Sequence, residues 1–405
     1  MPQVKPEIEA FARIRVVGVG GSGKNAINHM IDTKVRGVDF IAINTDAQDL
    51  QNSEARKKIH IGKNLTKGLG TGMNPELGKR AAEETKEEVQ EALKGSDMIF
   101  IAGGMGGGTG TGAGPVIARA AKELGALTVG VVTKPFSFEG QQRAKLAEQG
   151  LEDLRKEVDA LIVIPNDRLL ATVAKDTTLK QAFAMCDDVL RQAVEGISDL
   201  ITHPGDINVD FADVRAIMEN AGSALIGIGR ASGEKRAEEA ARMAISSPLL
   251  EISINGAKGV LLAVAGGDDL GMLEVQEAAR IVTESVDSNA KIIFGASKDE
   301  KLKKGEIKIT VIATSFPTGG TPSVRSGQLF AFPNREKERD ADLSAIGKIH
   351  NVIAPAPAPV LNATQEPPKE AVLPQPEEQK PPIKKIDDDD EWGPVPSFLR
   401  RPKIK

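Results

Sequence analysis

The residues with the clearest potential for chemistry are glycines in the stretch RIRVVGVGGSGKN, which begins at residue 13. Gly18 to Gly23 follows the G-x-G-x-x-G pattern of dinucleotide-binding loops, and the strand-like run FIAIN leads to Asp46, about where a ribose-binding carboxylate is expected. Gly18 to Lys24 also follows the G-x-x-x-x-G-K pattern, but Asn25 stands where a P-loop needs a hydroxyl for magnesium. This stretch therefore predicts a nucleotide site, with NAD as one alternative.

A second glycine loop follows the strand-like run MIFIA. Residues 103–114 contain eight glycines, and Pro115 comes next, in the expected first turn of a helix. Glycines let backbone N–H groups approach an anion closely, and a helix N-terminus adds roughly half a positive charge. Thr109 and Thr111 add hydroxyl donors. Because a dinucleotide enzyme needs one such loop, whereas two loops can surround a longer polyphosphate, the second loop disfavours NAD.

Short apolar runs that alternate with helical patterns must position these loops. The first set of strand-like runs is RIRVVGVG, FIAIN, KKIHIG, MIFIAGG, LTVGVVT and ALIVIP. Near-continuous apolar strands between helices predict an α/β fold with a doubly wound, mainly parallel sheet. Helical spacing of apolar residues over 179–200 predicts one long central helix, and later runs such as GVLLAVAGG and IKITVIATSF predict a second, smaller α/β domain.

Changes of composition along the chain predict the domain boundaries. The predicted segments are a flexible N-terminus at 1–10, a nucleotide-binding domain at 11–177, the central helix at 178–203, a C-terminal domain at 204–316, a disordered Pro-rich linker at 317–386 and a terminal peptide at 387–405. The linker contains runs such as PQPEEQKPP, which cannot bury enough apolar surface to offset the cost of ordering.

Composition excludes several classes of protein. The 405 residues carry a formal net charge of -5 with interleaved Lys and Glu, which argues against nucleic acid as a partner. The single cysteine, Cys186, excludes an internal disulfide framework and is expected to be an inert packing residue. No apolar run approaches the roughly 18 residues of a membrane span. We therefore expect a cytoplasmic protein without direct membrane insertion.

The motifs taken together resemble the FtsZ family of the tubulin superfamily, the bacterial division GTPases. GGGTGTGAG resembles the superfamily's phosphate loop, and GVGGSGKNAINHM, INTDAQDL, GLGTGMNPELG, PFSFEGQQR and NVDFADV occur with it. The resemblance covers roughly residues 10–316 and, through VPSFLRR, the tail. It implies a GTPase domain joined by a central helix to a second α/β domain. It also implies GTP or GDP as the nucleotide, with Mg²⁺ held through phosphates and water rather than by protein ligands, and K⁺ as a candidate further cation.

The resemblance further implies which residues surround the nucleotide. They are Gly20, Gly21, Ser22, Gly23, Lys24, Asn25, Asn44, Asp46, Gly70, Thr71, Gly72, Gly104, Gly106, Gly107, Gly108, Thr109, Gly110, Thr111, Pro135, Glu139, Arg143, Asn166, Phe183 and Asp187. Residues 21–25 and 108–110 would contact the phosphates, Glu139 and Arg143 would flank the ribose, and Asn166 would help to hold the base. Lys24 departs from the family pattern, which usually has Asn, and would add a cation beside the phosphates.

The implied base site agrees with the chemistry of guanine. Guanine presents N1–H and an exocyclic amino group on one edge, and a carboxylate such as Asp187 can accept from both, whereas adenine has an acceptor at N1. Phe183 lies one helical turn before Asp187, so its ring can stack on the base. Periodicity alone favours a core position for Phe183, and the motif context favours the base.

The stretch GDINVDFADVRAIMEN leaves two interpretations of its carboxylates open. Asp210 and Asp213 could cap a helix, or they could polarise the water that attacks the triphosphate, positioned by Asn208. If the central helix runs from Asp187 to about Thr202, the loop lies roughly 22 Å from the base site. The carboxylates would then act on a neighbouring subunit, and a head-to-tail contact that does not close makes a filament. The resemblance implies the same arrangement.

The tail predicts the remaining partners. Trp392, Val395, Phe398 and Leu399 cluster after the linker and are expected to dock onto membrane-tethering and regulatory division proteins at the division site. A self-assembling GTPase is therefore the preferred function. The alternatives are an NAD-dependent oxidoreductase, which leaves the second glycine loop unexplained, and a tubulin-like scaffold without hydrolysis, in which an Asp of NVDFADV would be missing.

Overall fold

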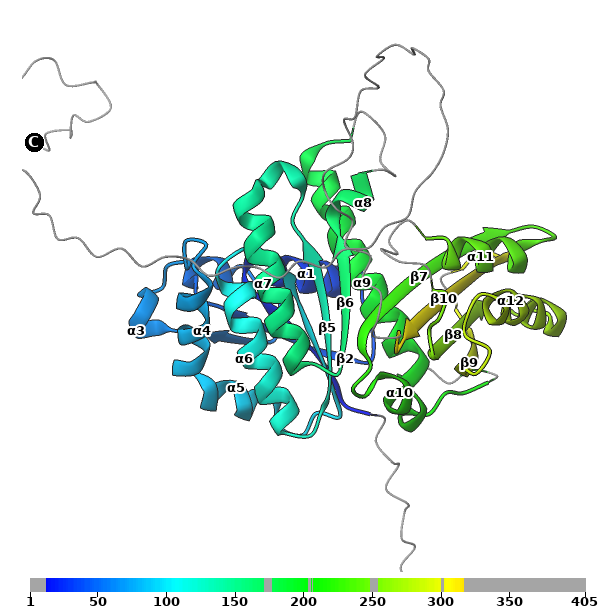
Figure 1. Ribbon diagram of the computed structural model, residues 1–405, viewed down its shortest axis with the longest axis horizontal. Helices are drawn as coiled ribbons and strands as arrows, with labels where there is room; N and C mark the ends of the chain where they lie inside the picture. The colour runs from blue at the N-terminus through cyan, green and yellow to red at the C-terminus, as the bar shows by residue number, and fades with distance from the viewer. Residues whose placement is uncertain are drawn as a thin grey trace, which may run out of the picture. The chain divides into compact units, whose positions relative to one another are not determined.

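The computed structural model describes residues 12–170, 177–202, 205, 207–247, 254–299 and 302–316. The predictions for the N-terminus at 1–10, the linker at 317–386 and the terminal peptide at 387–405 lie outside these residues. The described strands form one sheet in the order β3-β2-β1-β4-β5-β6-β7-β10-β8-β9 (Figure 1). They are β1 (Ile14–Val19), β2 (Val38–Asn44), β3 (Lys57–His60), β4 (Met98–Gly104), β5 (Leu127–Lys134), β6 (Ala160–Pro165), β7 (Gly222–Ser232), β8 (Gly259–Gly266), β9 (Lys291–Lys298) and β10 (Glu306–Thr314).

Strands β1 to β6 are all parallel, which confirms the predicted doubly wound, mainly parallel sheet. The helices that connect or follow the strands are α1 (Gly20–Asp32), α2 (Ala47–Gln51), α3 (Lys63–Thr66), α4 (Pro75–Glu84), α5 (Lys86–Leu93), α6 (Thr109–Glu123), α7 (Gln141–Glu157), α8 (Asn166–Leu170), α9 (Leu179–Thr202), α10 (Phe211–Met218), α11 (Arg236–Ile245) and α12 (Met272–Glu284). The strands read as continuous apolar runs because both faces of this sheet are buried.

Alternate residues of each strand enter different cores. Val16 and Phe100 pack with α1 and the long central helix α9, whereas Val17 and Ile101 pack with α4, α5, α6 and α7 on the other face. Cys186 of α9 is buried in the first of these cores, and burial raises the pKa of its thiol to about 12, as expected for a packing residue.

The second set of strands continues the same sheet instead of forming a separate one. β7 pairs with β6 in parallel over three register pairs, from Ala160 with Gly222 to Ile162 with Ala224. β10 then lies antiparallel between β7 and β8, and β9 is parallel to β8. A third core, with α11 and α12, covers one face of these strands. The strand-like pattern predicted these strands but carried no signal for their order.

Helix α9 runs from one edge of the sheet to the other. Near its start, Phe183 contacts Phe136, which follows the carboxyl end of β5. At its end, the Thr202 side chain packs on Gly37, where a Cβ would lie 2.5 Å from the Thr202 hydroxyl oxygen, and Gly37 directly precedes the amino end of β2. The segment after α9 therefore begins at the edge opposite to the glycine loops.

Candidate functional site

The two glycine loops lie against each other at the carboxyl ends of β1 and β4. The Gly104 N–H donates to Ser22 Oγ at 2.7 Å, although the two residues are 82 positions apart. Gly20 has a φ of +72°, and a Cβ there would lie 3.1 Å from the Gly110 nitrogen. Glycine is therefore required at residue 20 both by its backbone conformation and by the close approach of the second loop.

The threonines of the second loop are engaged by the protein. Thr109 Oγ1 lies 2.8 Å from Thr45 Oγ1 and 3.2 Å from Thr71 Oγ1, and Thr111 Oγ1 accepts from the Gly106 N–H at 2.9 Å. These hydroxyls join three segments and shape the turn that begins α6. Gly107, by contrast, has open space where a side chain would be, so its backbone is accessible to a ligand.

The segment GLGTGMN, residues 68–74, lies beside the second glycine loop and forms part of the same side of the candidate site. Gly72 and Met73 both have positive φ, and the segment ends at Asn74, whose side chain accepts from the first-turn N–H groups of α4. A Cβ at Gly108 would lie 2.1 Å from Thr71 Oγ1, so this segment packs directly on the second loop. Gly70 and Gly72 face open space. The structure thus brings together the predicted residues of 20–25, 70–72 and 104–111.

The loop after β2 adds an acidic residue, Asp49, that was not among the predicted site residues. Asp46 caps α2 by accepting from the Asp49 N–H at 2.9 Å. The Asp49 side chain binds Lys24 Nζ at 2.7 Å through one oxygen and accepts from Asn44 Nδ2 at 2.8 Å through the other. The cation predicted beside the phosphates is therefore paired. The one available sequence signal was an acidic residue at 49 in INTDAQDL.

The residues predicted for the ribose side form a local ion pair. Arg143 donates to Glu139 at 2.7 Å, and the other oxygen of Glu139 accepts from the Phe136 N–H at 3.0 Å. Pro135 approaches the second glycine loop, because its Cγ would lie 3.3 Å from a Cβ at Gly106. The segment after β5 is therefore anchored beside this loop.

Three phenylalanines gather at the start of α9. Phe183 is 41% exposed and meets the Phe136 ring edge-on at 5.4 Å, so it is not a core position. Phe138, which was not among the predicted site residues, stacks on Phe136 at 5.0 Å and is 61% exposed. The sequence PFSF places both rings close together, but only the fold shows that Phe138 is exposed while Phe136 is buried against Phe183.

Asp187 and Asn166 are the polar residues of the predicted base site. Burial raises the pKa of Asp187 to about 6, and the positive charges of His29 and Lys24 offset part of this increase. Asn166 is 5% exposed, and among the described residues its Oδ1 is the one buried side-chain nitrogen or oxygen without a hydrogen-bond partner. Such an atom carries a desolvation cost that a bound donor would remove. Both groups therefore fit a ligand that donates hydrogen bonds, as guanine does.

The candidate catalytic loop lies at the opposite edge of the sheet. Asp210 caps α10 by accepting from the Ala212 N–H at 3.1 Å, and Asn208 accepts from the Gly205 N–H at 2.7 Å. Asp213 is exposed in the first turn of α10 and makes no side-chain hydrogen bond or ion pair within the described part of the chain. The capping interpretation thus holds for Asp210, but it does not account for Asp213. No side-chain hydrogen bond or ion pair joins this loop to a described residue of the candidate nucleotide site.

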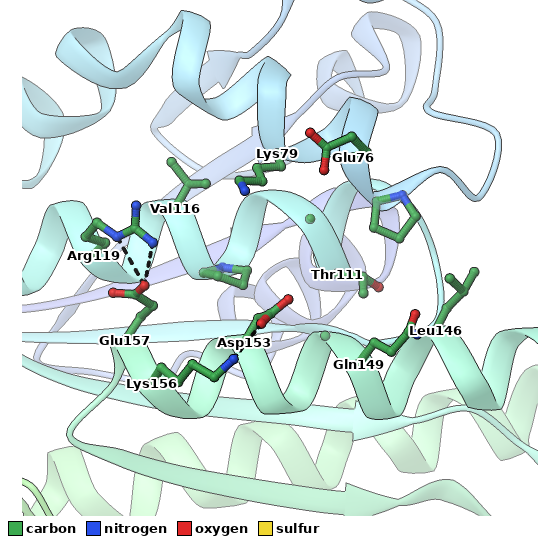
Figure 2. Close-up of a pocket in the computed structure, with 14 residues that line it drawn as sticks. Glu76, Lys79, Thr111, Val116, Arg119, Leu146, Gln149, Asp153, Lys156 and Glu157 are labelled. Carbon is green, nitrogen blue, oxygen red and sulfur yellow. Dashed lines mark hydrogen bonds and ion pairs between the residues drawn. The ribbon is translucent and has the colours of Figure 1, made fainter.

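A separate groove of about 380 Å³ lies between α4, α6 and α7 (Figure 2). Arg119 pairs with Glu157 across it, while Lys79 and Asp153 also line it. Thr111 of α6, whose methyl group packs on Gly150 of α7, also lines it. Because the charges around this groove are mixed and exposed, nothing in its lining selects a ligand.

Neither a metal cluster nor a membrane span is found among the residues that the structure describes. No group of three or more His, Cys, Asp and Glu side chains there could hold a metal ion. No described helix is long and apolar enough to cross a membrane.

Comparisons with known proteins agree on one family. Residues 13–174 match the GTPase domain of the Tubulin/FtsZ family, and residues 222–317 match the C-terminal domain of the FtsZ family. An FtsZ dimer from M. jannaschii, described as empty, is 49% identical, with 76% of this chain and 89% of that chain covered and a TM-score of 0.72. A mutant form of M. jannaschii FtsZ gives the same identity and TM-score over 75% and 91%. CetZ2 from Haloferax volcanii, a GTPγS-bound protofilament, shares the fold at 23% identity over 74% and 92%, with a TM-score of 0.64.

Proposed function

The chain belongs to the Tubulin/FtsZ family of GTPases, and from this premise we propose that it hydrolyses GTP at contacts between its own copies in a head-to-tail filament. The observation that supports this most strongly is the separation of two groups of residues. The glycine loops lie at the carboxyl edge of the sheet, whereas Asp210 and Asp213 lie after α9, at the amino edge.

The nucleotide would lie across the carboxyl edge. The N–H groups of both glycine loops and the N-termini of α1 and α6 suit phosphate oxygens. The carboxylate of Asp187 and the unpaired Asn166 Oδ1 suit the donors of guanine, and the exposed ring of Phe183 can stack on the base. Mg²⁺ would neutralise phosphate charge when bound with the nucleotide, and K⁺ is a candidate further cation.

Hydrolysis would need residues from a second copy. The 15 residues from Asp187 to Thr202 correspond to about 22 Å of helix, so the exposed Asp213 is too far away to reach phosphates in its own chain. In a head-to-tail contact, Asp210 and Asp213 of one copy would meet the nucleotide of the next and polarise the attacking water, with Asn208 positioning the loop. The dimer among the M. jannaschii structures and the CetZ2 protofilament support such assembly.

The cellular role we propose is the division ring. The chain would form protofilaments on the cytoplasmic side of the membrane at mid-cell, recruited by membrane-tethering and regulatory division proteins through residues 387–405. Those residues lie outside the described part of the chain, so this part of the proposal rests on the sequence and the family.

The test is phosphate release as a function of protein concentration, with GTP and ATP side by side. We expect negligible specific activity below a critical concentration, a rise above it, and no comparable rise with ATP. Equal activity per molecule at high dilution would contradict the shared site. Binding of NADH in place of GTP would favour an oxidoreductase, and GTP binding without hydrolysis at any concentration would favour a scaffold.

A further inference from the structure

Lys24 is a buried cation at the first glycine loop. It lies near the start of α1, where its residue is 8% exposed, and its Nζ lies 2.7 Å from Asp49 Oδ1. The ion pair joins α1 to α2 across 25 positions of the chain. A buried ammonium requires a counter-charge, and Asp49 supplies it.

Asp49 brings its negative charge against the same glycine loop. Apart from the neighbouring backbone of α1, the atom nearest to the position of a Cβ at Gly21 is Asp49 Oδ2, at 3.5 Å. The Asn44 side chain holds this oxygen by donating to it at 2.8 Å. A carboxylate fixed so close to a predicted phosphate loop would repel phosphate oxygens unless another cation lay between them.

The pair also has unused hydrogen-bonding capacity. An ammonium group has three donors, and Lys24 uses one of them on a described residue, the carboxylate of Asp49. An ionised carboxylate has about four acceptor sites, and the Asp49 side chain uses two, for Lys24 and Asn44. Spare donors and spare acceptors therefore lie side by side. The donors suit a phosphate oxygen, and the acceptors suit a hydrated divalent cation.

We propose that Lys24 and Asp49 together determine how strongly nucleotide binding depends on Mg²⁺. Lys24 donates to a phosphate oxygen, while Asp49 favours a metal-bearing phosphate group and disfavours a metal-free one. This inference rests on the proposed guanine-nucleotide function and specifies the ionic form of the nucleotide that the site accepts. It also gives a role to Lys24, which departs from the family pattern at this position, because Asp49 supplies the matching negative charge.

The test measures the dissociation constant of GDP, which is not hydrolysed, with Mg²⁺ and with EDTA. The quantity compared is the ratio of the constant in EDTA to that in Mg²⁺. Asp49→Asn keeps the shape and leaves Lys24 uncompensated, so metal-free GDP should bind more tightly and the ratio should fall roughly tenfold. Lys24→Asn leaves Asp49 uncompensated, so the ratio should rise by about the same factor. In the double variant the ratio should return to within roughly threefold of the original value.

A matched control is the ion pair of Lys86 with Glu123, whose Nζ and Oε2 lie 2.8 Å apart and which joins α5 to α6 outside the proposed site. Glu123→Gln should leave the ratio unchanged. Thermal unfolding of every variant shows whether the folded protein is being measured.

Two results would overturn the proposal in different ways. If Asp49→Asn and Lys24→Asn lower the midpoint of thermal unfolding but leave the ratio at its original value, the pair only ties α1 to α2. If the unsubstituted protein binds GDP under neither condition, the proposed function itself fails, and the pair has no nucleotide to select.

Discussion

The two edges of the sheet hold their polar side chains in different ways. At the carboxyl edge the contacts join residues far apart in the sequence, such as Ser22 with Gly104 and Thr45 with Thr109. At the amino edge the side-chain hydrogen bonds of the Asp loop are local, since Asn208 accepts from Gly205 and Asp210 accepts from Ala212, although the Ile207 backbone pairs with Ala296. The residues of the proposed nucleotide site are therefore held by side-chain contacts between distant segments, whereas the polar side chains of the Asp loop are held within their own segment.

The largest effect that would test this contrast is expected from Asp213→Ala. Because Asp213 makes no side-chain contact that the structure describes, its loss should leave folding and GTP binding near their original values. Turnover should fall roughly 10²- to 10⁴-fold, as for the loss of a general base. The measurements are phosphate release above the critical concentration and equilibrium GTP binding.

The matched control for that experiment is Glu87→Ala, another acid in the first turn of a helix, α5. It should change neither quantity. A large loss of GTP affinity in Asp213→Ala, with turnover per bound nucleotide unchanged, would mean that the two edges are not functionally separate.

A smaller effect is expected from Asp187→Asn at the carboxyl edge. An amide can accept from one guanine donor but brings its own donors against the other, so discrimination between GTP and ATP should fall roughly 100-fold. Competition binding with the two nucleotides measures it. Phe183→Leu is a useful comparison, because it removes the ring and keeps the carboxylate, and both nucleotides should weaken by similar factors. Unchanged discrimination in Asp187→Asn would remove this residue from the base site.

The effect of pH on GTP affinity is expected to be smaller than the effect of Asp187→Asn on nucleotide discrimination. The pKa of Asp187 is raised to about 6 by burial, and the acceptor needed by guanine is the ionised form. Affinity for GTP should therefore be about tenfold lower at pH 5 than at pH 7, and Asp187→Asn should flatten this dependence. Nucleotide binding titrations at several pH values measure the effect.

Folding stability should respond to pH in the opposite direction. Because the pKa of Asp187 in the folded protein lies above its ordinary value of 3.8, folding favours the protonated form. The contribution is fully present below about pH 4 and is lost as the pH rises through about 6, with a maximum near 3 kcal/mol. Urea unfolding of the nucleotide-free protein and of Asp187→Asn would measure it. Parallel changes in stability and affinity would contradict the assignment.

The smallest effect separates capping from catalysis at Asp210. Asp210→Ala should lower the free energy of unfolding by about 1 kcal/mol because the cap of α10 is lost, whereas Asp210→Asn should retain most of it. If Asp210 also polarises water, both variants should lose turnover. Normal turnover in Asp210→Asn would leave capping as the whole role of this residue.

The sequence predicted features that depend on short stretches of chain. The glycine loops, the central helix and the parallel direction of β1 to β6 follow from composition and periodicity. Phe183 is exposed, and its role at the base stays a prediction. Features that depend on contacts the fold creates between side chains were not predicted. Asp49 becomes notable only when the fold brings it to Lys24, and the stacking of Phe138 depends on the turn after β5. The short pairing of β6 with β7 could not be predicted from the sequence. The apolar pattern of a strand is the same whether the strand lies at the edge of a sheet or pairs with a further strand.

A helix that crosses the sheet from edge to edge also gives the proposed filament a length scale. The 24 residues of α9 extend for about 36 Å, and in the proposed filament each added copy would hold its nucleotide site near the start of this helix and its Asp loop beyond the end of it. The length of helix α9 within each subunit would thus help to determine the repeat distance of the polymer. One helical turn more or less in α9 would change the spacing by about 5.4 Å and keep the orientation of the following loop, whereas one added or deleted residue would rotate that loop by about 100°.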